Sequence, residues 1–364
     1  MQVCHLHLPA NYLRIRITNE KQKKNLEDDV TNFLKTTALT AAFLPMAGVA
    51  MAQNVAVTFG TNWVAQAEHG GYYQAVADGT YAACGLDVTI LPGGPQVNNR
   101  ALMIAGQVDF HMGGSTLDGF SAVQEGLPIV TVAASFQKDP QVIVTHPGFA
   151  TSFADLVKLD KVLISDGGVL TFWAYMIQAY GFKPEQREVY TFSAAPLIAN
   201  PTWGMQGYLS SEPYFFEKET GIKPDAWLIA DAGYTAYSTM IETMADNIAN
   251  RPDVVQCFVD GSAIGWTNYL YGDNAAANAL IKTDNPEMTD EAIAYGIAAM
   301  KEHGIVFSGD ALTMGAGAIS DTQMEDFFNK MVAVGATPAD LDWKASYTTQ
   351  FVNKGVGLDL KPAE

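Results

Sequence analysis

Three side chains able to contact a ligand occur together in a short polar segment. Trp63, Glu68 and His69 lie around the junction between a β-branched run, 54–60, and an apolar run at helical spacing, 69–85. An indole can stack on a flat ring, and an imidazole can hydrogen-bond its edge. We therefore predict that Trp63 and His69 contact a small planar ligand. Alternatively, Trp63 could pack at a hinge and His69 could cap the helix, and Glu68 is interpreted as a solvated side chain.

Polar residues also follow a second predicted strand, 108–114. Ser115 and Thr116 begin a predicted helix directly after two glycines, and Asp118 lies in its first turn. The free N–H groups at a helix N-terminus favour a ligand acceptor, while serine or threonine there also serves as a plain N-cap. Ser115, Thr116 and Asp118 are therefore candidate ligand contacts, and a capping role is compatible with that function.

A similar opening occurs in the second half of the chain. Gly167 and Gly168 follow the predicted strand that starts at Lys161, and Thr171 lies three residues further on. Two glycines allow a ligand to approach the backbone closely. We expect Gly167, Gly168 and Thr171 to contact the ligand from a second wall, and a bare turn is the alternative.

One acid and one aromatic ring complete the set of candidates. Glu212 follows Ser210 and Ser211 at a predicted strand end, and facing a cleft it would accept two hydrogen bonds from an amino-pyrimidine or amidine-like edge. As a helix-start acid it needs no ligand, because the helix dipole favours a carboxylate there. Tyr234 follows a later strand and is either a second stacking ring or a residue that packs at a hinge.

The charge of these segments indicates the charge of the ligand. Among the polar segments that follow predicted strands, Lys138 is the one basic residue, while acids and aromatics predominate. A nitrate or sulfonate site favours Arg, Lys or helix N-termini. The composition therefore favours a flat, neutral or cationic nitrogen heterocycle, although helix N-termini alone could hold a sulfonate.

The sequence contains no motif typical of catalysis. It has no G-x-S-x-G, no P-loop, no G-x-G-x-x-G after a strand and no H-E-x-x-H. Of the six histidines, the four beyond residue 52, His69, His111, His146 and His303, are scattered and lack a nearby cysteine, which argues against a zinc site there. We predict a binding protein without catalytic residues, cofactor or metal, and a secreted enzyme on the same fold is the alternative.

The order of elements predicts the fold class. Strand and helix patterns alternate in two successive blocks, which is typical of α/β lobes with helices beside the sheets. No low-complexity linker separates the blocks, so we expect a central cleft and hinge strands. Beyond Tyr237 the chain is mostly helical, with predicted helices over 252–271, 274–283, 289–303 and 320–334.

The N-terminal region carries a pattern typical of export. Residues 34–52 contain a lysine, an apolar stretch of about 15 residues and an A-x-A ending, which indicates a signal peptide cleaved after Ala52. We interpret residues 1–33 as an extension from a misassigned start upstream of Leu34. No later segment is long and apolar enough to span a membrane. Localisation in the periplasm is therefore expected for a protein that is not embedded in the membrane.

Charge and cysteine content bound the remaining functions. The net charge of −18 opposes binding to nucleic acid. Cys84 and Cys257 remain after the predicted cleavage, and an exported protein could join them in a disulfide. Both cysteines also lie in apolar helical contexts, so two separate buried thiols are equally compatible with the sequence.

The segment 61–94 resembles a known family. The order Asn62-Trp63, His69 and Gly71, followed by G-L-D-V at 85–88, is similar to the opening of exported solute-binding proteins of ABC importers. The branch in question contains binders of thiamine-pyrimidine precursors and of nitrate, sulfonate and taurine. Ala65 stands where that family usually has proline. The blocks AGQVDFHMGG, EGLPIVTVAA, GYLSSEPY and NRPDVVQCFVDGSAIGW extend the resemblance over nearly all of residues 53–364.

The resemblance implies a type 2 periplasmic-binding-protein fold. One lobe would comprise 53–145 plus 236–364, with a second lobe, 146–235, inserted into it. The protein would be a monomer that closes on a small-molecule ligand and delivers it to an ABC permease, with Asn62 as a further ligand contact. The pyrimidine branch also includes enzymes with a cysteine-rich iron motif. This chain has no such run of cysteines, and Asp118 lies nearest to the position of their substrate histidine.

Overall fold

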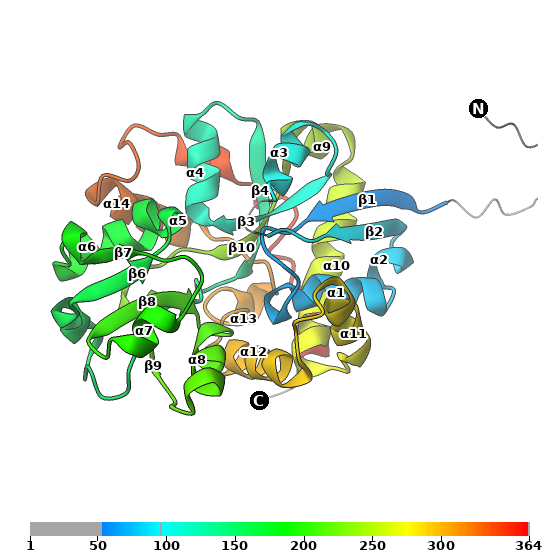
Figure 1. Cartoon of the computed structure of the whole chain (residues 1–364). Helices are drawn as coiled ribbons and strands as arrows, with labels where there is room; N and C mark the ends of the chain where they lie inside the picture. The colour runs from blue at the N-terminus through cyan, green and yellow to red at the C-terminus, as the bar shows by residue number, and fades with distance from the viewer. Residues whose placement is uncertain (1–52, 95–96, 363–364) are drawn as a thin grey trace, which may run out of the picture. The chain divides into compact units, whose positions relative to one another are not determined.

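Two five-stranded sheets organise the protein. The computed structural model describes residues 53–94 and 97–362, so the predicted signal peptide and the upstream extension lie outside the described residues. Figure 1 shows β6–β9, in green, grouped apart from β1–β3, in blue and cyan. The predicted α/β fold with two lobes is confirmed, and each lobe is built on one of the sheets.

The first sheet has the strand order β2-β1-β3-β10-β4. β1 (Val55–Gly60) pairs in parallel with β2 (Leu86–Leu91) and with β3 (Phe110–Ser115). β10 (Ser238–Met244) lies antiparallel between β3 and β4 (Ile129–Phe136). The carboxyl ends of β1 and β3 therefore meet at one edge, where ligands of open α/β sheets bind.

The second sheet has the strand order β7-β6-β8-β5-β9. β6 (Lys161–Ile164) pairs in parallel with β7 (Arg187–Val189) and β8 (Trp203–Tyr208). β5 (Gln141–Thr145) lies antiparallel between β8 and β9 (Asp225–Leu228). The predicted lobe boundary after residue 145 assigns β5 to the first lobe, whereas its ladder hydrogen bonds join it to the second sheet.

Two short connections join the sheets. Residues 137–140 lead from β4 to β5, and residues 229–237 lead from β9 to β10. The Gln323 side chain donates to the carbonyl oxygens of Gln137 and Thr235, at 3.2 Å each, and so ties the two connections together. Lys138 and Asp231 form an ion pair of 2.9 Å between them. The two connections are short, but neither is the strand expected from the sequence: residues 137–140 form a bend, and residues 229–237 contain the 3₁₀ turn Ala230–Ala232.

Helices cover both sheets, and the four long C-terminal helices match the predicted ranges closely. The α-helices after the first sheet's strands are α1 (Gly70–Ala77), α2 (Thr80–Ala83), α3 (Asn99–Ile104) and α4 (Thr116–Gln124). The second lobe contains α5 (Asp166–Gly168), α6 (Ala174–Tyr180), α7 (Ala195–Ala199) and α8 (Glu212–Thr220). The remaining α-helices are α9 (Ala245–Asn250), α10 (Pro252–Tyr271), α11 (Ala275–Asp284), α12 (Asp290–Glu302), α13 (Ala311–Met314) and α14 (Asp321–Ala333).

Shorter helices complete the connections. The 3₁₀ segments are η1 (Ala67–His69), η2 (Phe153–Lys158), η4 (Pro184–Gln186), η5 (Ala230–Ala232), η6 (Trp343–Ser346) and η7 (Leu358–Leu360). A π-helical turn, η3 (Val169–Trp173), follows α5. The single helix predicted over 69–85 is wrong, because Gly79 adopts φ 77° and separates α1 from α2.

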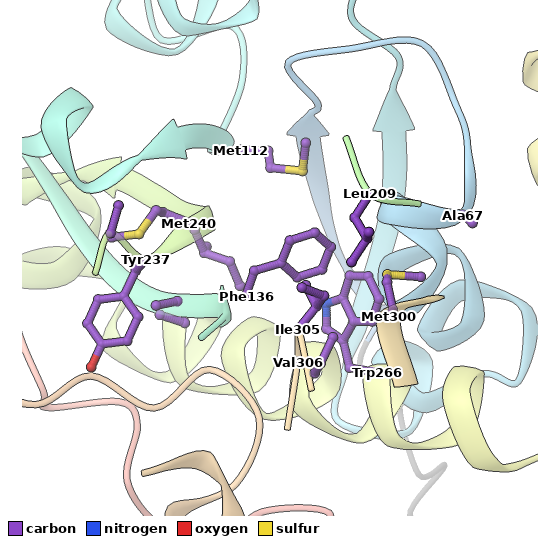
Figure 2. Packing of buried hydrophobic residues seen from close by; sticks show 14 of the residues in the cluster. Ala67, Met112, Phe136, Leu209, Tyr237, Met240, Trp266, Met300, Ile305 and Val306 are labelled. Carbon is purple, nitrogen blue, oxygen red and sulfur yellow. The ribbon is translucent and has the colours of Figure 1, made fainter. Parts of the chain in front are cut away.

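A continuous apolar core passes from one lobe to the other. Buried residues of both sheets belong to one hydrophobic cluster. Figure 2 shows Leu209, which follows β8, near Phe136 at the end of β4 and Trp266 of α10. The Leu209 N–H also donates to the carbonyl oxygen of Pro140, at 2.9 Å. The hinge region is therefore packed as well as hydrogen-bonded.

The sequence is compatible with a disulfide or with two separate thiols, and the structure contains the disulfide. Cys84, after α2, bonds Cys257 of α10, and their Cα atoms are 5.9 Å apart. The bond fixes α2 against the long helix that covers the first sheet. Within residues 53–94 and 97–362, no helix has both the length and the apolar character needed to cross a membrane.

Candidate ligand-binding site

A cavity lies between the two lobes. Its volume is about 230 Å³. The first lobe supplies residues after β1 and from β3 and β10, and the second lobe supplies residues of β5 and β8 and residues that follow β7 and β8. The lining residues are Asn62, Trp63, Gln66, Glu68, His69, Met112, Gln141, Tyr190, Phe192, Gln206, Gly207, Tyr208, Ser211, Glu212 and Thr239.

Hydrogen bonds hold the connection after β1 in place. The Thr61 hydroxyl donates to the carbonyl oxygen of Trp63 at 2.8 Å, and the Gly93 N–H donates to the same oxygen at 3.0 Å. The Asn99 side chain donates to the Thr61 carbonyl oxygen at 2.8 Å. Because Asn99 is the first residue of α3, this helix positions the backbone that carries Asn62 and Trp63. Ala65, at the position of the usual proline, is fully buried.

Aromatic rings from both lobes meet at the cavity. The Trp63 indole lies 5.2 Å from the Phe192 ring, centroid to centroid, with 40° between their planes. Phe192 in turn lies 5.2 Å from Tyr190. Phe192 has φ 61°, a left-handed conformation that is uncommon for a bulky residue, and it is 56% exposed. The rings offer stacking surface, and the strained, exposed Phe192 belongs to the less firmly packed side of the cleft.

Glu68 is buried, which corrects its interpretation as a solvated side chain. It is 2% exposed, and it accepts a hydrogen bond from the hydroxyl of Ser210 in the second lobe. Burial raises the pKa of Glu68 to about 7, and the negative charge of Glu212 acts in the same direction. This carboxyl group therefore connects the two walls of the cavity.

Glu212 provides the second carboxyl group of the cavity. It is the first residue of α8, and its carboxylate accepts from the Tyr208 N–H at 2.6 Å. Burial raises the pKa of Glu212 above its usual value. None of the described residues that line the cavity is a lysine or an arginine. A ligand with N–H donors or a positive charge would satisfy both carboxyl groups.

Two of the side chains that line the cavity contain a buried hydrogen-bonding atom without a partner. His69 is 1% exposed, its Nδ1 atom has no hydrogen bond, and burial lowers its pKa to about 3. The imidazole is therefore neutral. The Oε1 atom of Gln141, on the opposite wall, also lacks a partner. An unsatisfied buried polar atom costs about 1–3 kcal/mol, which a ligand or a water molecule would recover.

The strand β10 contributes a strained residue. Thr239 has φ 51°, is almost fully buried and lines the cavity beside the point where the second connection enters the first sheet. A positive φ is a rare conformation for a β-branched residue and costs on the order of 1–3 kcal/mol. Strain of this kind is concentrated at functional sites in other proteins.

Three predicted site residues lie outside the cavity: two cap α4, and the third binds the backbone just before β10. Ser115 is the N-cap, and its hydroxyl accepts from the Leu117 N–H at 3.2 Å. The Asp118 carboxylate accepts from the N–H groups of Gly114 and Ser115, at 2.7 and 3.2 Å. The Thr116 hydroxyl accepts from the Tyr237 N–H at 3.0 Å. Their polar groups are thus used within the protein.

The remaining predicted residues also lie outside the cavity. Gly167 and Gly168 form α5, and Thr171 donates back to their carbonyl oxygens at 3.3 and 3.1 Å. Gly168 lies close to the side chain of Gln206, which does line the cavity. Tyr234 is fully buried between Tyr175, at 5.5 Å, and Phe327, at 5.3 Å between ring centroids. Tyr234 is therefore the residue that packs at the hinge.

Four of the predicted residues do line the cavity: Asn62, Trp63, His69 and Glu212. Sequence reasoning missed Tyr190, Phe192, Gln206, Tyr208 and Thr239. Tyr190 and Phe192 follow the short strand β7, but the run REVYTFS that contains them has the β-branched and aromatic composition of one continuous strand, so no loop signal marks them. Tyr208 and Gln206 lie within β8, and only their alternation along that strand could have indicated that they share a face.

Comparison with known proteins identifies the family. Residues 66–277, more than half of the chain, match the model of the family described as NMT1/THI5 like, and the protein belongs to this family. The resemblance noted in the sequence is thereby confirmed. A search among curated proteins found none that matches the chain.

Solved structures share the fold at low sequence identity. A putative periplasmic sulfonate-binding protein, SsuA from Methylobacillus flagellatus KT, is 14% identical with a TM-score of 0.56, over 82% of this chain and 93% of that one. The nitrate-binding protein NrtA from Synechocystis PCC 6803 is 14% identical with a TM-score of 0.53, over 80% and 84%. A Candida albicans gene product, described as having the generic periplasmic binding protein fold, is 14% identical with a TM-score of 0.54, over 82% and 97%. The protein thus has the periplasmic-binding-protein fold.

Proposed function

We propose that the protein is the periplasmic solute-binding component of an ABC importer and that it binds a small, flat nitrogen heterocycle. A pyrimidine with an amino group, of the kind used as a thiamine precursor, fits this description. The observation that carries the proposal is a cavity with two carboxyl groups and no basic residue among its described lining residues. The match to the NMT1/THI5-like family and the fold of importer binding proteins support the class.

Each wall of the cavity would make a distinct contact. Trp63 would stack on the ring, and Glu212 would accept hydrogen bonds from the amino edge. The neutral His69 imidazole would donate to a ring nitrogen, and the Gln141 amide oxygen would accept from the amino group, because both side chains have an unpartnered polar atom. The contacts bind and orient the ligand, and we propose no chemical step. The closed protein would be a monomer recognised by a membrane permease.

A second candidate ligand is an alkanesulfonate, taurine or nitrate-type anion. Two proteins with this fold are named for binding sulfonate and nitrate, and Ser211 and Glu212 at the N-terminus of α8 line the cavity. Helix N-terminal N–H groups attract anions. The two carboxyl groups in the same cavity oppose an anion, so the nitrogen heterocycle is the first choice.

Isothermal titration of the full chain with 4-aminopyrimidine, ethanesulfonate and nitrate tests the proposal. We expect 4-aminopyrimidine to bind, and Glu212→Gln to weaken it by about tenfold to 100-fold, since hydrogen bonds to a charged group contribute about 1.5–3 kcal/mol. Glu188→Gln, which changes an exposed carboxylate on β7, is the matched control. Binding of ethanesulfonate without binding of 4-aminopyrimidine would favour the second candidate.

A further inference from the structure

Glu68 and Ser210 form a contact between the lobes inside the cavity wall. Glu68 belongs to η1 of the first lobe, and Ser210 follows β8 in the second lobe. They are 2% and 4% exposed, and the Ser210 hydroxyl donates to a Glu68 carboxyl oxygen. Next to them, the rings of Tyr214 on α8 and Tyr295 on α12 lie 5.5 Å apart. Closing the cleft at this point therefore removes Glu68 from water.

The groups around Glu68 do not supply a positive charge. Glu212 on α8, Tyr208 at the end of β8 and Tyr269 on α10 are the titratable groups that interact with it electrostatically. The adjacent His69 is neutral, because burial lowers its pKa to about 3. Near neutral pH these groups are negative or uncharged. Burying an ionised carboxylate without a compensating positive charge is costly and therefore opposes closure of the cleft.

We propose, on the basis of the proposed function, that the lobes close most tightly when one positive charge enters the cleft, either on the ligand or as a proton on Glu68. A cationic ligand between Glu68 and Glu212 would leave Glu68 ionised. A neutral ligand would require Glu68 to take up a proton from solvent, and the carboxyl group would keep its hydrogen bond to Ser210 in that form. Closure therefore depends on the charge of the ligand, a relation that we call the charge rule.

The sign of the pH effect follows from Glu68. An exposed glutamate has a pKa of about 4.3, whereas the closed cleft raises the pKa of Glu68 to about 7. Closure around a neutral ligand therefore favours the protonated form and becomes weaker as pH rises between these two values. The affinity should fall by up to about tenfold per pH unit in this range and level off above pH ~7. With a cationic ligand, no such decline is expected.

A pair of probes with the same shape separates the two cases. Benzamidine is a flat cation and benzamide is its neutral counterpart, and neither changes charge between pH 5 and 9, about the range of the experiment. We would titrate the full chain with each probe at about pH 5.5, 6.5, 7.5 and 8.5. Each titration is repeated in two buffers with different ionisation enthalpies, because the difference in heat gives the number of protons taken up. We expect benzamide to bind with uptake of up to one proton, and benzamidine to bind without proton exchange.

Variants assign the effect to Glu68. Glu68→Gln should make the affinity for benzamide independent of pH and weaken benzamidine by about tenfold or more. Glu217→Gln, which removes an exposed carboxylate from α8, should behave as the unmodified protein. The proposal would be overturned if the affinity of the unmodified protein for benzamide did not change with pH, or if it still changed with pH in Glu68→Gln.

A measurement without ligand keeps this inference separate from the proposed function. If neither probe binds although 4-aminopyrimidine does, the site rejects these two benzene derivatives but the assigned ligand class stands; if 4-aminopyrimidine also fails to bind, that class is wrong. In either case small-angle scattering of the free protein tests the charge rule. Acidification from pH 8.5 to 5.5 should compact the unmodified protein but not Glu68→Gln, since the shift spans about the range of the Glu68 titration. An equal radius of gyration at both pH values in both proteins would refute the charge rule.

Discussion

Two connections at the same edge of the first sheet differ in what their polar side chains do: one lines the cavity, and the other stabilises a helix. After β1, residues 61–69 contribute Asn62, Trp63, Gln66, Glu68 and His69 to the cavity lining, and the Nδ1 atom of His69 has no hydrogen-bond partner. After β3, the chain enters α4 directly, and Ser115, Thr116 and Asp118 use their polar groups to cap the helix and to bind β10's preceding residue. Both connections are polar, but only the first leaves hydrogen-bonding capacity for a ligand.

The difference teaches how to distinguish a ligand contact from a structural one at a strand end. A polar group that is already satisfied gains little from a ligand, because it exchanges one hydrogen bond for another. An unsatisfied buried group gains the full desolvation cost when a partner arrives. Loop length matters as well, since the immediate start of α4 after β3 commits the first polar residues to capping.

The largest effect that separates the two connections should come from glycine replacements in the helices that follow them. A Cβ atom on Gly71 of α1 would lie 2.3 Å from the Trp266 ring, which is fully buried and cannot move aside. Gly71→Ala should lower the free energy of unfolding by about 3 kcal/mol through overpacking. Chemical denaturation monitored by circular dichroism measures the loss.

Gly119 of α4 is the matched position. Its added Cβ would lie 3.3 Å from the Cβ of Ser346, a tight but tolerable contact. Gly119→Ala should change the unfolding free energy by less than about 1 kcal/mol, since alanine also favours the helix by a similar amount. Equal losses for the two replacements would contradict the rigid packing that we assign to α1.

The second effect concerns the ligand. Trp63→Ala removes the ring that faces the cavity from the β1 connection, and the affinity for 4-aminopyrimidine should fall by about tenfold to 100-fold, equivalent to about 1.4–2.8 kcal/mol. Trp63 is only partly buried, so the melting temperature of the free protein should change little. Isothermal titration and thermal denaturation separate the two readouts. An affinity within about threefold of the unmodified protein would rule out stacking.

The fold was largely predictable because local signals agreed with the tertiary structure. The helix predicted over 252–271 is α10, and the strand predicted over 54–60 differs from β1 by one residue. The errors arose where a local pattern has two solutions. The run 69–85 is helical throughout by composition, yet Gly79 takes a left-handed conformation and divides it. β5 reads equally well as a strand of either lobe, and only its pairing partners decide.

The site was predictable where side chains project from a loop. Trp63, His69 and Glu212 follow strands, and the cavity includes all three. Phe192 and Thr239 could not be found in this way, because their approach to the cavity depends on positive φ angles that no sequence pattern indicates. Glu68 was misjudged because its burial depends on Ser210, which comes from the other lobe 142 residues later.

The smallest effect tests whether the β3 connection is only structural. Ser115→Ala removes the acceptor for the Leu117 N–H and one half of the capping box on α4. The unfolding free energy should fall by about 1 kcal/mol, the usual cost of losing a serine N-cap. The affinity for 4-aminopyrimidine should stay within about threefold, because Ser115 does not line the cavity. Denaturation and titration on the same sample measure both quantities. A tenfold loss of affinity with unchanged stability would place Ser115 in contact with the ligand and remove the contrast between the two connections, since a pure cap acts on folding and leaves binding by the folded protein unaltered.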